Sequence, residues 1–200
     1  IIPVKDALVM ARLDNVEDRR EWRQRIVDHD GEIDDHPEGG LRRWLALTTQ
    51  LGFSKDYVVS MQGALPATQF ASNAYLTFVR ERTVLEAVAS SLTELFSPNI
   101  IAERVQGMLQ NYDFITEDSL TYFSYRKSQA NRDSNWTLDF IDRHASTREE
   151  QDRCLNALRF KCSMLWAMLD ALASAYHLGG TIPPGVWDPQ TQNGLLGKST

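Results

Sequence analysis

The feature of this sequence that most constrains its fold is a long helical pattern near the C-terminal end. Thr147 and Glu150 form a capping box, which satisfies the first free backbone amides of a helix, and the pattern continues to about Tyr176. A helix with one apolar stripe buries that stripe against other helices, so this segment predicts a helical bundle. The expected stripe consists of Leu158, Cys162, Leu165, Leu169 and Leu172.

Helix signals recur along the rest of the chain. Helix starts are marked by N-caps, a capping box and a proline in the first turn: Ser54, Thr83 with Glu86, and Ser97 with Pro98. There is no alternating strand pattern and no internal repeat, so we expect an all-α fold. The further expected helices cover residues 3–13, 16–30, 41–51, 57–61, 67–81, 84–96, 99–111, 117–129 and 136–144.

The chain is expected to divide into a helical domain over residues 1–177 and a tail over residues 178–200. The tail contains Pro183-Pro184-Gly185, which is typical of a loop or linker. At the other end, Ile1-Ile2-Pro3-Val4 places bare apolar residues directly before a helical pattern. We therefore expect the N-terminal helix of the domain to be missing from this sequence.

Composition narrows the classes of partner. The formal net charge of the 200 residues is −6, and no basic stripe supplies the phosphate contacts that nucleic-acid binding needs. No apolar run approaches the length of a membrane span, so we expect no membrane partner. The two cysteines, Cys154 and Cys162, have no metal-ligand spacing and are expected to pack as small buried hydrophobes in a reducing compartment. The expected localisation is the cytoplasm.

Several helix faces that should be apolar carry a charged residue. Arg25 and His29 stand four residues apart, so they share one face of a helix that stops at Gly31. A surface arginine and a histidine at a helix end would be the ordinary alternative. Lys161 lies within the apolar stripe of the last helix, where a lysine either extends to solvent or finds an anion.

The same pattern appears on three further helices. Glu94 continues a side made of small residues, Ala87, Ser90 and Ser91, and is either a structural partner of an interior arginine or a ligand contact. Tyr122 and Arg126 again stand four apart, and Lys5 follows apolar Val4 in the first helix. Cations pointing inward would enclose a pocket suited to a small polycarboxylate. These cations are Lys5, Arg25, Arg126 and Lys161.

A metal centre is the main competing interpretation of an inward-facing polar cluster in a helical bundle. Di-iron bundles use Glu-x-x-His pairs, and none of the four histidines has a glutamate three residues before it. Glycine-rich nucleotide loops are absent as well. We therefore expect no metal site.

Five stretches, taken together, carry a specific resemblance that extends from the first residue to about Tyr176. They are Ile2-Pro-Val-Lys5-Asp-Ala; Arg23-Gln-Arg25-Ile-Val-Asp-His29-Asp-Gly; Ser90-Ser-Leu-Thr-Glu94-Leu-Phe; Tyr122 with Arg126 and Ser128-Gln-Ala-Asn-Arg; and Phe160-Lys161 with Leu165-Trp-Ala-Met-Leu-Asp170-Ala. The sequence resembles the pyrroloquinoline-quinone synthase family, whose members complete the cofactor PQQ. The resemblance implies a heme-oxygenase-like helical bundle around a central pocket, a homodimer, and no metal or redox cofactor. It also implies a reaction: closure of the second ring of the PQQ precursor, then an eight-electron oxidation by O2 that releases hydrogen peroxide.

The resemblance also implies roles for individual residues. His29 resembles a proton-transfer group, and Tyr122, with His29 and Arg126, resembles the group that surrounds O2 and peroxide. The implied substrate-binding residues are Lys5, Arg25, Tyr75, Glu94 and Lys161, with Arg126 as a further contact of carboxylate or quinone oxygens. Two departures are expected to alter the site: Ile101 stands where some members have histidine, and the loop between Gly31 and Gly40 is longer. Further ligands of the family lie upstream of Ile1.

Other functions remain open beside the oxidase. A non-catalytic PQQ-binding or carrier protein could use the same cationic pocket for affinity alone. A thiaminase-like hydrolase would need a nucleophilic cysteine, for which Cys162 is the only candidate near Lys161. The expected partners of the oxidase are the polycarboxylate precursor and PQQ, a second copy of the chain, and a small PQQ-pathway carrier protein or fused domain.

Overall fold

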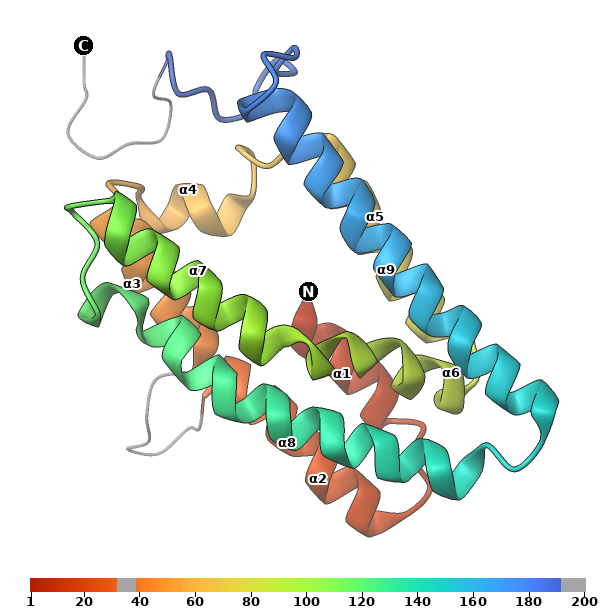
Figure 1. Ribbon diagram of the computed structural model, residues 1–200. Coiled ribbons are helices and arrows are strands. Elements are labelled where there is room, and N and C mark those ends of the chain that lie inside the picture. The colour runs from red at the N-terminus through yellow and green to blue at the C-terminus, as the bar shows by residue number, and fades with distance from the viewer. Residues whose placement is uncertain (32–38, 192–200) are drawn as a thin grey trace.

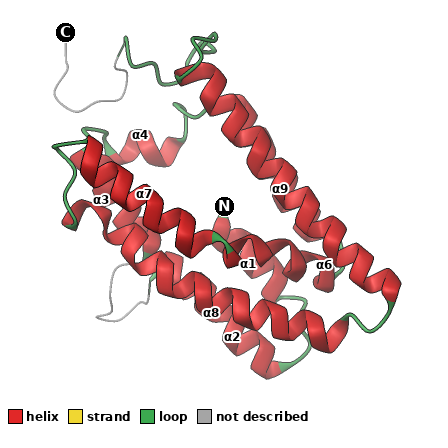
Figure 2. Ribbon diagram, in the orientation of Figure 1, coloured by secondary structure: helices red, strands yellow, loops and turns green. Residues whose placement is uncertain are grey.

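The computed structural model describes residues 1–31 and 39–191, and every regular element in these ranges is a helix (Figures 1 and 2). The all-α prediction is therefore confirmed. In chain order the elements are α1 (Ile2–Met10), α2 (Val16–Asp30), α3 (Gly40–Gln50), α4 (Lys55–Ser60), α5 (Pro66–Glu81), α6 (Val84–Ala89), the 3-10 helix η1 (Ser90–Leu95), α7 (Ser97–Asn111), the 3-10 helix η2 (Asp118–Leu120), α8 (Thr121–His144) and α9 (Arg148–Tyr176).

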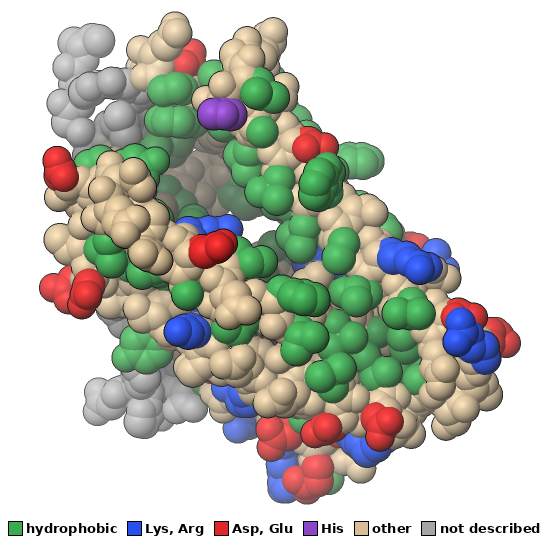
Figure 3. All heavy atoms as spheres, viewed as in Figure 1, with side chains coloured by type: hydrophobic (Ala, Val, Ile, Leu, Met, Phe, Trp, Pro, Cys, Tyr) green, Lys and Arg blue, Asp and Glu red, His purple; other side chains and the backbone are tan. Residues whose placement is uncertain are grey.

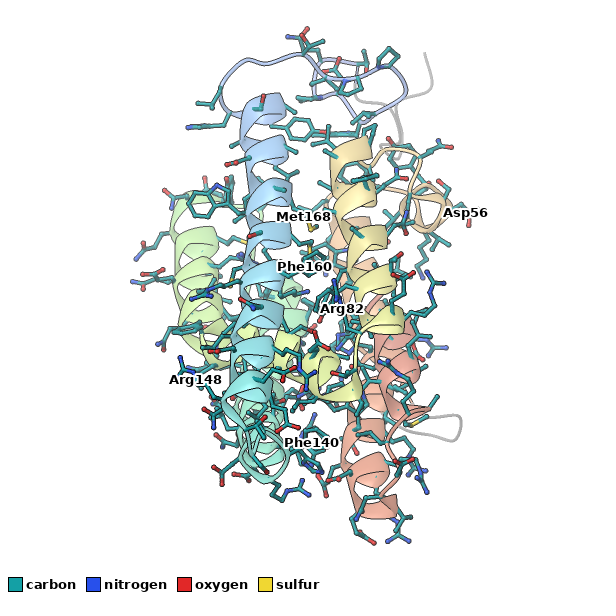
Figure 4. The ribbon with its side chains drawn as sticks, turned by 90° about the vertical axis from the view of Figure 1, so that its right-hand side faces the viewer. Asp56, Arg82, Phe140, Arg148, Phe160 and Met168 are labelled. Carbon is teal, nitrogen blue, oxygen red and sulfur yellow. The ribbon has the colours of Figure 1, made fainter. Side chains whose placement is uncertain are left out.

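The centre of the molecule is formed by α6 and η1, which contact α8 on one side and α9 on the other. Ala87, Val88 and Ala89 are fully buried there, because small side chains let the surrounding helices approach. Two groups of helices extend away from this centre: α5 lies beside α9, while α7 and α8 run next to each other with α2 alongside (Figure 1). In Figure 4, Phe160 and Met168 of α9 lie toward α5, and the ring of Phe160 stacks on Phe78 at 4.3 Å.

The predicted helix over residues 84–96 is α-helical only as far as Ala89 and continues as η1. The hydroxyl groups of Ser90 and Ser91 donate to the carbonyl oxygens of Ala87 and Val88, three residues earlier, at 2.7 and 2.6 Å. Hydroxyl groups that compete for backbone acceptors in this way favour a tighter turn over the regular α-helical pattern. The segment that carries Glu94 therefore has a different pitch from the one expected.

Three of the predicted helix caps are confirmed, and one is wrong. The capping boxes at Thr83 and Thr147 form as expected, and the Ser54 hydroxyl accepts a hydrogen bond from the amide of Tyr57. Ser97, however, is not an N-cap: α7 already begins at Ser97, and Phe96 before it has helical backbone angles. Because η1 leads almost directly into α7, no residue there adopts the extended conformation that a capping serine requires.

The largest difference from the sequence prediction is in α8, which is one continuous helix where we expected two separated by a loop at residues 130–135. Two polar residues of this segment, Asp133 and Ser134, turn inward. Asp133 is 4% exposed and Ser134 2% exposed, and the Thr137 hydroxyl donates to the carbonyl oxygen of Asp133 at 2.8 Å. Tertiary contacts thus stabilise a helical segment that local propensity does not favour.

The apolar stripe predicted for α9 faces outward. Leu165, Leu169 and Leu172 are 37%, 59% and 41% exposed, and Cys162 is exposed rather than buried. The buried side of α9 consists of smaller or more flexible residues at coiled-coil spacing, because it packs against the tightly packed centre and against α5. The buried and partly buried residues on this side are Cys154, Ala157, Lys161, Met164, Met168, Ala171 and Ala175.

The described part of the tail contains no regular element and packs back onto the helices. Val186 is 6% exposed and joins Leu65 and Ala175 in a small core. The amide of Trp187 donates to the carbonyl oxygen of Gly63 at 3.0 Å, and the Tyr176 hydroxyl donates to the carbonyl oxygen of Trp187 at 3.0 Å. Among the described residues, none of the helices combines the length and apolar character that crossing a membrane requires.

Candidate functional site

A cavity of about 180 Å³ lies between α1, α5, η1 and α9. Four of the residues predicted to bind substrate line it: Lys5, Tyr75, Glu94 and Lys161. Ser91 and Met164 also line it, and Ile1 and Ile2 contribute apolar surface. Of the small residues expected to leave room beside Glu94, only Ser91 borders the cavity, whereas Ala87 and Ser90 are fully buried in the close-packed centre. Larger cavities lie elsewhere, at the end of the molecule that contains α4 and the tail and between α7 and α8.

Lys161 lines this cavity from α9 and is partly buried. Its ammonium nitrogen lies 3.6 Å from the centroid of the Tyr75 ring, a cation–π contact. Burial, together with the positive charge of Lys5, lowers the pKa of Lys161 to about 7, against the opposing effects of Glu94 and Asp6. No carboxylate of the described residues lies within ion-pair distance of this ammonium group. Lys161 is therefore poised between its charged and neutral forms near neutral pH.

Lys5 reaches the cavity from α1 and is 6% exposed. Its ammonium group forms an ion pair with the carboxylate of Asp6, which is 1% exposed. The ammonium nitrogen also lies 5.3 Å from the centroid of the Trp22 ring, whose indole NH donates to the carbonyl oxygen of Asp6 at 3.0 Å. Trp22 thus fixes the turn of α1 that carries the charge pair.

Arg25 is buried in α2, so the alternative of a surface arginine is wrong. Its guanidinium lies 4.2 Å from the Trp22 ring centroid. It donates to the carbonyl oxygen of Asp133 at 2.7 Å and to the hydroxyl of Thr137 at 2.9 Å, and its Nε lies 3.8 Å from the Asp133 carboxylate. These bonds hold Arg25 against α8, and Arg25 does not line the cavity.

His29 is 4% exposed and shares the buried face of α2 with Arg25, as its spacing predicted. Its Nδ1 lies 2.9 Å from the carbonyl oxygen of Arg25. A carbonyl oxygen only accepts, so Nδ1 carries the hydrogen and the neutral ring presents a lone pair at Nε2. Nε2 is buried and has no hydrogen-bond partner among the described residues.

The surroundings of His29 favour the neutral ring. Burial lowers the pKa of His29, and so do the positive charges of Arg126 and Lys5, while the Arg25 carbonyl and Asp6 raise it. A neutral imidazole with one nitrogen held and the other free is in the form of a general base. The electrostatic influence of Arg126, Lys5 and Asp6 also shows that His29 lies among the charged residues of the site.

Arg126 of α8 and Glu94 of η1 form an ion pair that joins the two helices. Nη2 of Arg126 lies 3.0 Å from Oε2 of Glu94, and Nη1 donates to the side-chain oxygen of Gln129 at 3.2 Å. Arg126 is 8% exposed, whereas the Glu94 side chain is 25% exposed and borders the cavity. Both interpretations of Glu94 from the sequence thus find support in the geometry: it pairs with an interior arginine, and it faces the cavity.

Two tyrosines belong to different environments. Tyr75 is 5% exposed, its hydroxyl lies 3.0 Å from that of Ser90, and burial raises its pKa against the opposing effects of Lys5 and Ser90. Tyr122 packs edge-on against Trp44 at 5.2 Å, in a separate core cluster. Burial raises the pKa of Tyr122, Arg126 lowers it and Glu94 raises it, so Tyr122 is within electrostatic reach of the Arg126–Glu94 pair although it does not line the cavity.

The predicted departures and competing sites can also be placed. Ile101 packs beside Leu47, Leu120 and Phe123 and lies outside the cavity lining. Most of the loop between Gly31 and Gly40 lies outside the described residues. Cys162, the only nucleophile considered for a hydrolase, is exposed and does not border the cavity. The described residues contain no group of three or more His, Cys, Asp or Glu side chains suited to a metal ion.

Sequence reasoning missed the carboxylates that accompany the cations. Asp6 and Asp133 are both almost fully buried, and each contacts one of the predicted cations. A buried cation needs an anion, so the adjacent Asp6 was a usable signal. Asp133 was hidden because residues 130–135 were expected to be a loop, which removed it from the face of α8 that holds Arg126 and Thr137.

Comparison with known proteins identifies the family and several relatives of this chain. The model of the TENA/THI-4/PQQC family matches residues 2–171. A pyrroloquinoline-quinone synthase of Acidiphilium cryptum is 58% identical over 186 residues, which are 93% of this chain and 75% of that protein. One from Gluconobacter oxydans is 55% identical over 94% of this chain and 77% of that protein.

A third relative is the bifunctional coenzyme PQQ synthesis protein C/D of Methylorubrum extorquens, 56% identical over 94% of this chain. The aligned region covers only 50% of that protein, so this chain corresponds to about half of the bifunctional relative and to about three quarters of the two synthases. The match to the family model and these identities over nearly the whole chain establish that this chain belongs to the TENA/THI-4/PQQC family, the family with the helical heme-oxygenase-like fold.

Proposed function

We propose that this protein is a pyrroloquinoline-quinone synthase, which closes the second ring of the PQQ precursor and oxidises it with O2 to PQQ. The observation that carries the proposal is the cavity in which Lys5 and Lys161 meet from α1 and α9. Arg126 pairs with Glu94, which lines the cavity, and Arg25 packs on the ring of Trp22, which Lys5 also contacts. PQQ and its precursor are polycarboxylates, and ammonium and guanidinium groups are the side chains that bind carboxylates most strongly. Synthases at 55–58% identity support the same assignment.

The cavity takes only part of such a ligand. Its volume of about 180 Å³ is below the ~300–1,000 Å³ typical of ligand pockets. We propose that one carboxylate-bearing end enters between Lys161 and Lys5, while the remaining rings extend past Ile1 and Ile2, which form the apolar side of the cavity. Tyr75 would then support Lys161 through its ring and leave the ammonium hydrogens free for the ligand.

His29 is the proposed proton-transfer group. Oxidation of the ring system requires protons to leave carbon or nitrogen before electrons pass to O2, and a positioned neutral imidazole can accept them. The held Nδ1 and free Nε2 of His29 support this role. Arg126 and Tyr122 are proposed to surround O2 and the peroxide product, with the electrostatic proximity of the two residues as support. The proposed reaction uses no resident metal or redox cofactor.

The decisive experiment supplies the precursor and O2 to purified protein and follows hydrogen peroxide and the quinone absorbance. A synthase produces peroxide and PQQ over many turnovers, and it does so equally after exhaustive chelation. A protein that only carries PQQ would form a stoichiometric complex with PQQ and release no peroxide, and that result would replace the enzyme with the carrier.

The proposed assembly is a homodimer in the cytoplasm. The outward apolar row of α9, which includes Leu165, Leu169 and Leu172, supplies exposed surface of the kind that subunit contacts cover. Figure 3 shows apolar side chains along α9. Both cysteines are free thiols, which agrees with a reducing compartment. The half of the bifunctional relative that this chain does not match supports a fused or separate PQQ-pathway protein as a further partner.

A further inference from the structure

The cations of the site differ in how their charge is compensated. Three of the four have a carboxylate partner: Lys5 with Asp6, Arg25 with Asp133, and Arg126 with Glu94. Lys161 has none within 4.0 Å among residues 1–31 and 39–191. An anionic ligand that enters the cavity therefore meets ion pairs rather than a row of uncompensated positive charges.

The three carboxylates differ in their freedom to move. Asp6 is 1% exposed and its backbone carbonyl is held by the Trp22 indole. Asp133 is 4% exposed and also bonds the guanidinium of Arg132 at 2.7 Å. Glu94 is the exception: its side chain is 25% exposed, has one more rotatable bond than aspartate, and Arg126 is its one ion-pair partner among the described residues. Glu94 is the carboxylate that can be displaced at the lowest cost in free energy.

The position of Glu94 gives this freedom a consequence. Glu94 borders the cavity and Arg126 does not, so the carboxylate stands between the guanidinium and the space where a ligand binds. We propose that Glu94 is a resident counter-ion that holds Arg126 in the ligand-free protein and gives it up to a carboxylate of the ligand. This inference rests on the proposed function only for the identity of the ligand. The exchange of Glu94 for another carboxylate at Arg126 does not depend on it.

The exchange follows from ordinary electrostatics. Arg126 exchanges its charge-assisted hydrogen bond to Glu94 for an equivalent one to the ligand carboxylate. The released Glu94 side chain turns toward the cavity and solvent. The Arg126–Glu94 pair must be broken in every binding event, so it lowers the affinity for the product and favours release of PQQ. Glu94 is thus a positioning residue: it keeps Arg126 ordered when the site is empty and limits how tightly the site holds an anion.

This role makes a prediction of opposite sign to that of a direct substrate contact. Removing a contact weakens binding, whereas removing a resident counter-ion strengthens it. The test is Glu94→Gln, which keeps the shape of the side chain and removes its charge. We expect the Kd for PQQ to fall about three- to tenfold and its dissociation rate to slow by a similar factor, since tenfold corresponds to about 1.4 kcal/mol.

Three comparisons make the result specific. Glu103→Gln removes the same formal charge from an exposed position of α7 and should leave the Kd unchanged. In an Arg126→Gln background, Glu94→Gln should give less than half of its gain, because no pair remains to be broken. Benzene-1,3,5-tricarboxylate is a second probe that does not depend on the identity of the substrate, and it should follow PQQ.

Each outcome decides the inference. Weaker binding of both probes by Glu94→Gln, or a change no larger than that of Glu103→Gln, overturns it. An equal gain in affinity from Glu94→Gln in the Arg126→Gln background would mean that Glu94 only repels the anion, and it also overturns the inference. Failure of both probes to bind any variant overturns it as well. If the wild-type protein ignores PQQ but Glu94→Gln tightens the tricarboxylate, the proposed function fails and the exchange stands.

Discussion

Lys161 is the residue whose charge near neutral pH depends most on its surroundings. Its pKa of about 7 means that the ammonium form is present below that pH and is lost above it in the free protein. A bound anion favours the ammonium form and raises the pKa in the complex, so above about pH 7 binding must take up a proton. Affinity for PQQ should therefore fall with rising pH above about 7, by up to ~tenfold per unit.

Isothermal titration at several pH values, in buffers of different ionisation enthalpy, would measure both the affinity and the proton uptake. Lys161→Arg is the matched control, because a guanidinium stays charged over this range and should abolish the dependence. A pH profile that is the same in the wild type and in Lys161→Arg would mean that another group titrates.

His29 should separate binding from oxidation. His29→Asn keeps a hydrogen-bonding side chain but cannot carry a proton near neutral pH, so we expect near-native PQQ affinity and a ~10²–10⁴-fold slower oxidation. Rapid mixing with precursor and O2, followed by absorbance, should show a partly oxidised quinoid intermediate accumulating. Completion of the oxidation at the native rate would exclude His29 as the proton-transfer group and make Tyr122 the next residue to substitute.

At the residue scale, the sequence predicted which cations face inward but not which carboxylates pair with them. Arg25 and His29 could be placed on one buried face because a spacing of four residues has a fixed geometric meaning in a helix. The ion pair between Arg126 and Glu94 could not be placed, because it joins α8 to η1 and depends on how the two helices cross. Contacts between elements distant in sequence require the fold.

At the element scale, the continuity of α8 can be tested at an exposed position. Asn131 lies in the middle of the segment that we expected to be a loop, and its side chain is exposed. In a continuous helix, Asn131→Gly should be about 1 kcal/mol less stable than Asn131→Ala, because glycine has the lower helix propensity. Urea unfolding of both variants measures the difference.

The same pair of substitutions at Thr181, which is exposed in the irregular tail, is the control and should differ much less. Equal stability of the two Asn131 variants would contradict a continuous helix and favour a loop between residues 130 and 135.

The bounds of helices were predictable where their signals are local in the sequence. The buried face of a helix was not predictable where packing against other helices decides it. The bounds of α2, α5 and α9 match the predicted ranges within a residue, and local signals mark two of them, the stop at Gly31 for α2 and the capping box at Thr147 for α9. The buried side of α9 could not be recognised, because its row of small residues is less apolar than the outward row of leucines. Burial there is set by the space beside α6 and η1, which periodicity alone does not reveal.

At the scale of the whole molecule, the outward row of α9 should govern self-association. Leu169 is 59% exposed, so Leu169→Glu leaves the folded chain intact and places a charge in the row that we propose as the dimer contact. Sedimentation velocity should show a dimer for the wild type and a monomer for Leu169→Glu. Leu138→Glu, at a 42% exposed position on α8, should remain dimeric, and a dimer in both variants would assign the contact to another face.

The pairing of cations with carboxylates also bears on how fast a ligand arrives. The chain carries a formal net charge of −6, and the compensated residues around the cavity add little positive field to offset it at a distance. Because charges farther apart than a Debye length are screened, a tricarboxylate approaching from bulk water is repelled by the protein only once it comes within about that distance, ~10 Å at 0.1 M salt. Moderate salt should therefore accelerate the binding of PQQ in stopped-flow measurements. Salt has the reverse effect on enzymes whose surface charge is opposite in sign to that of the substrate, because it weakens electrostatic steering.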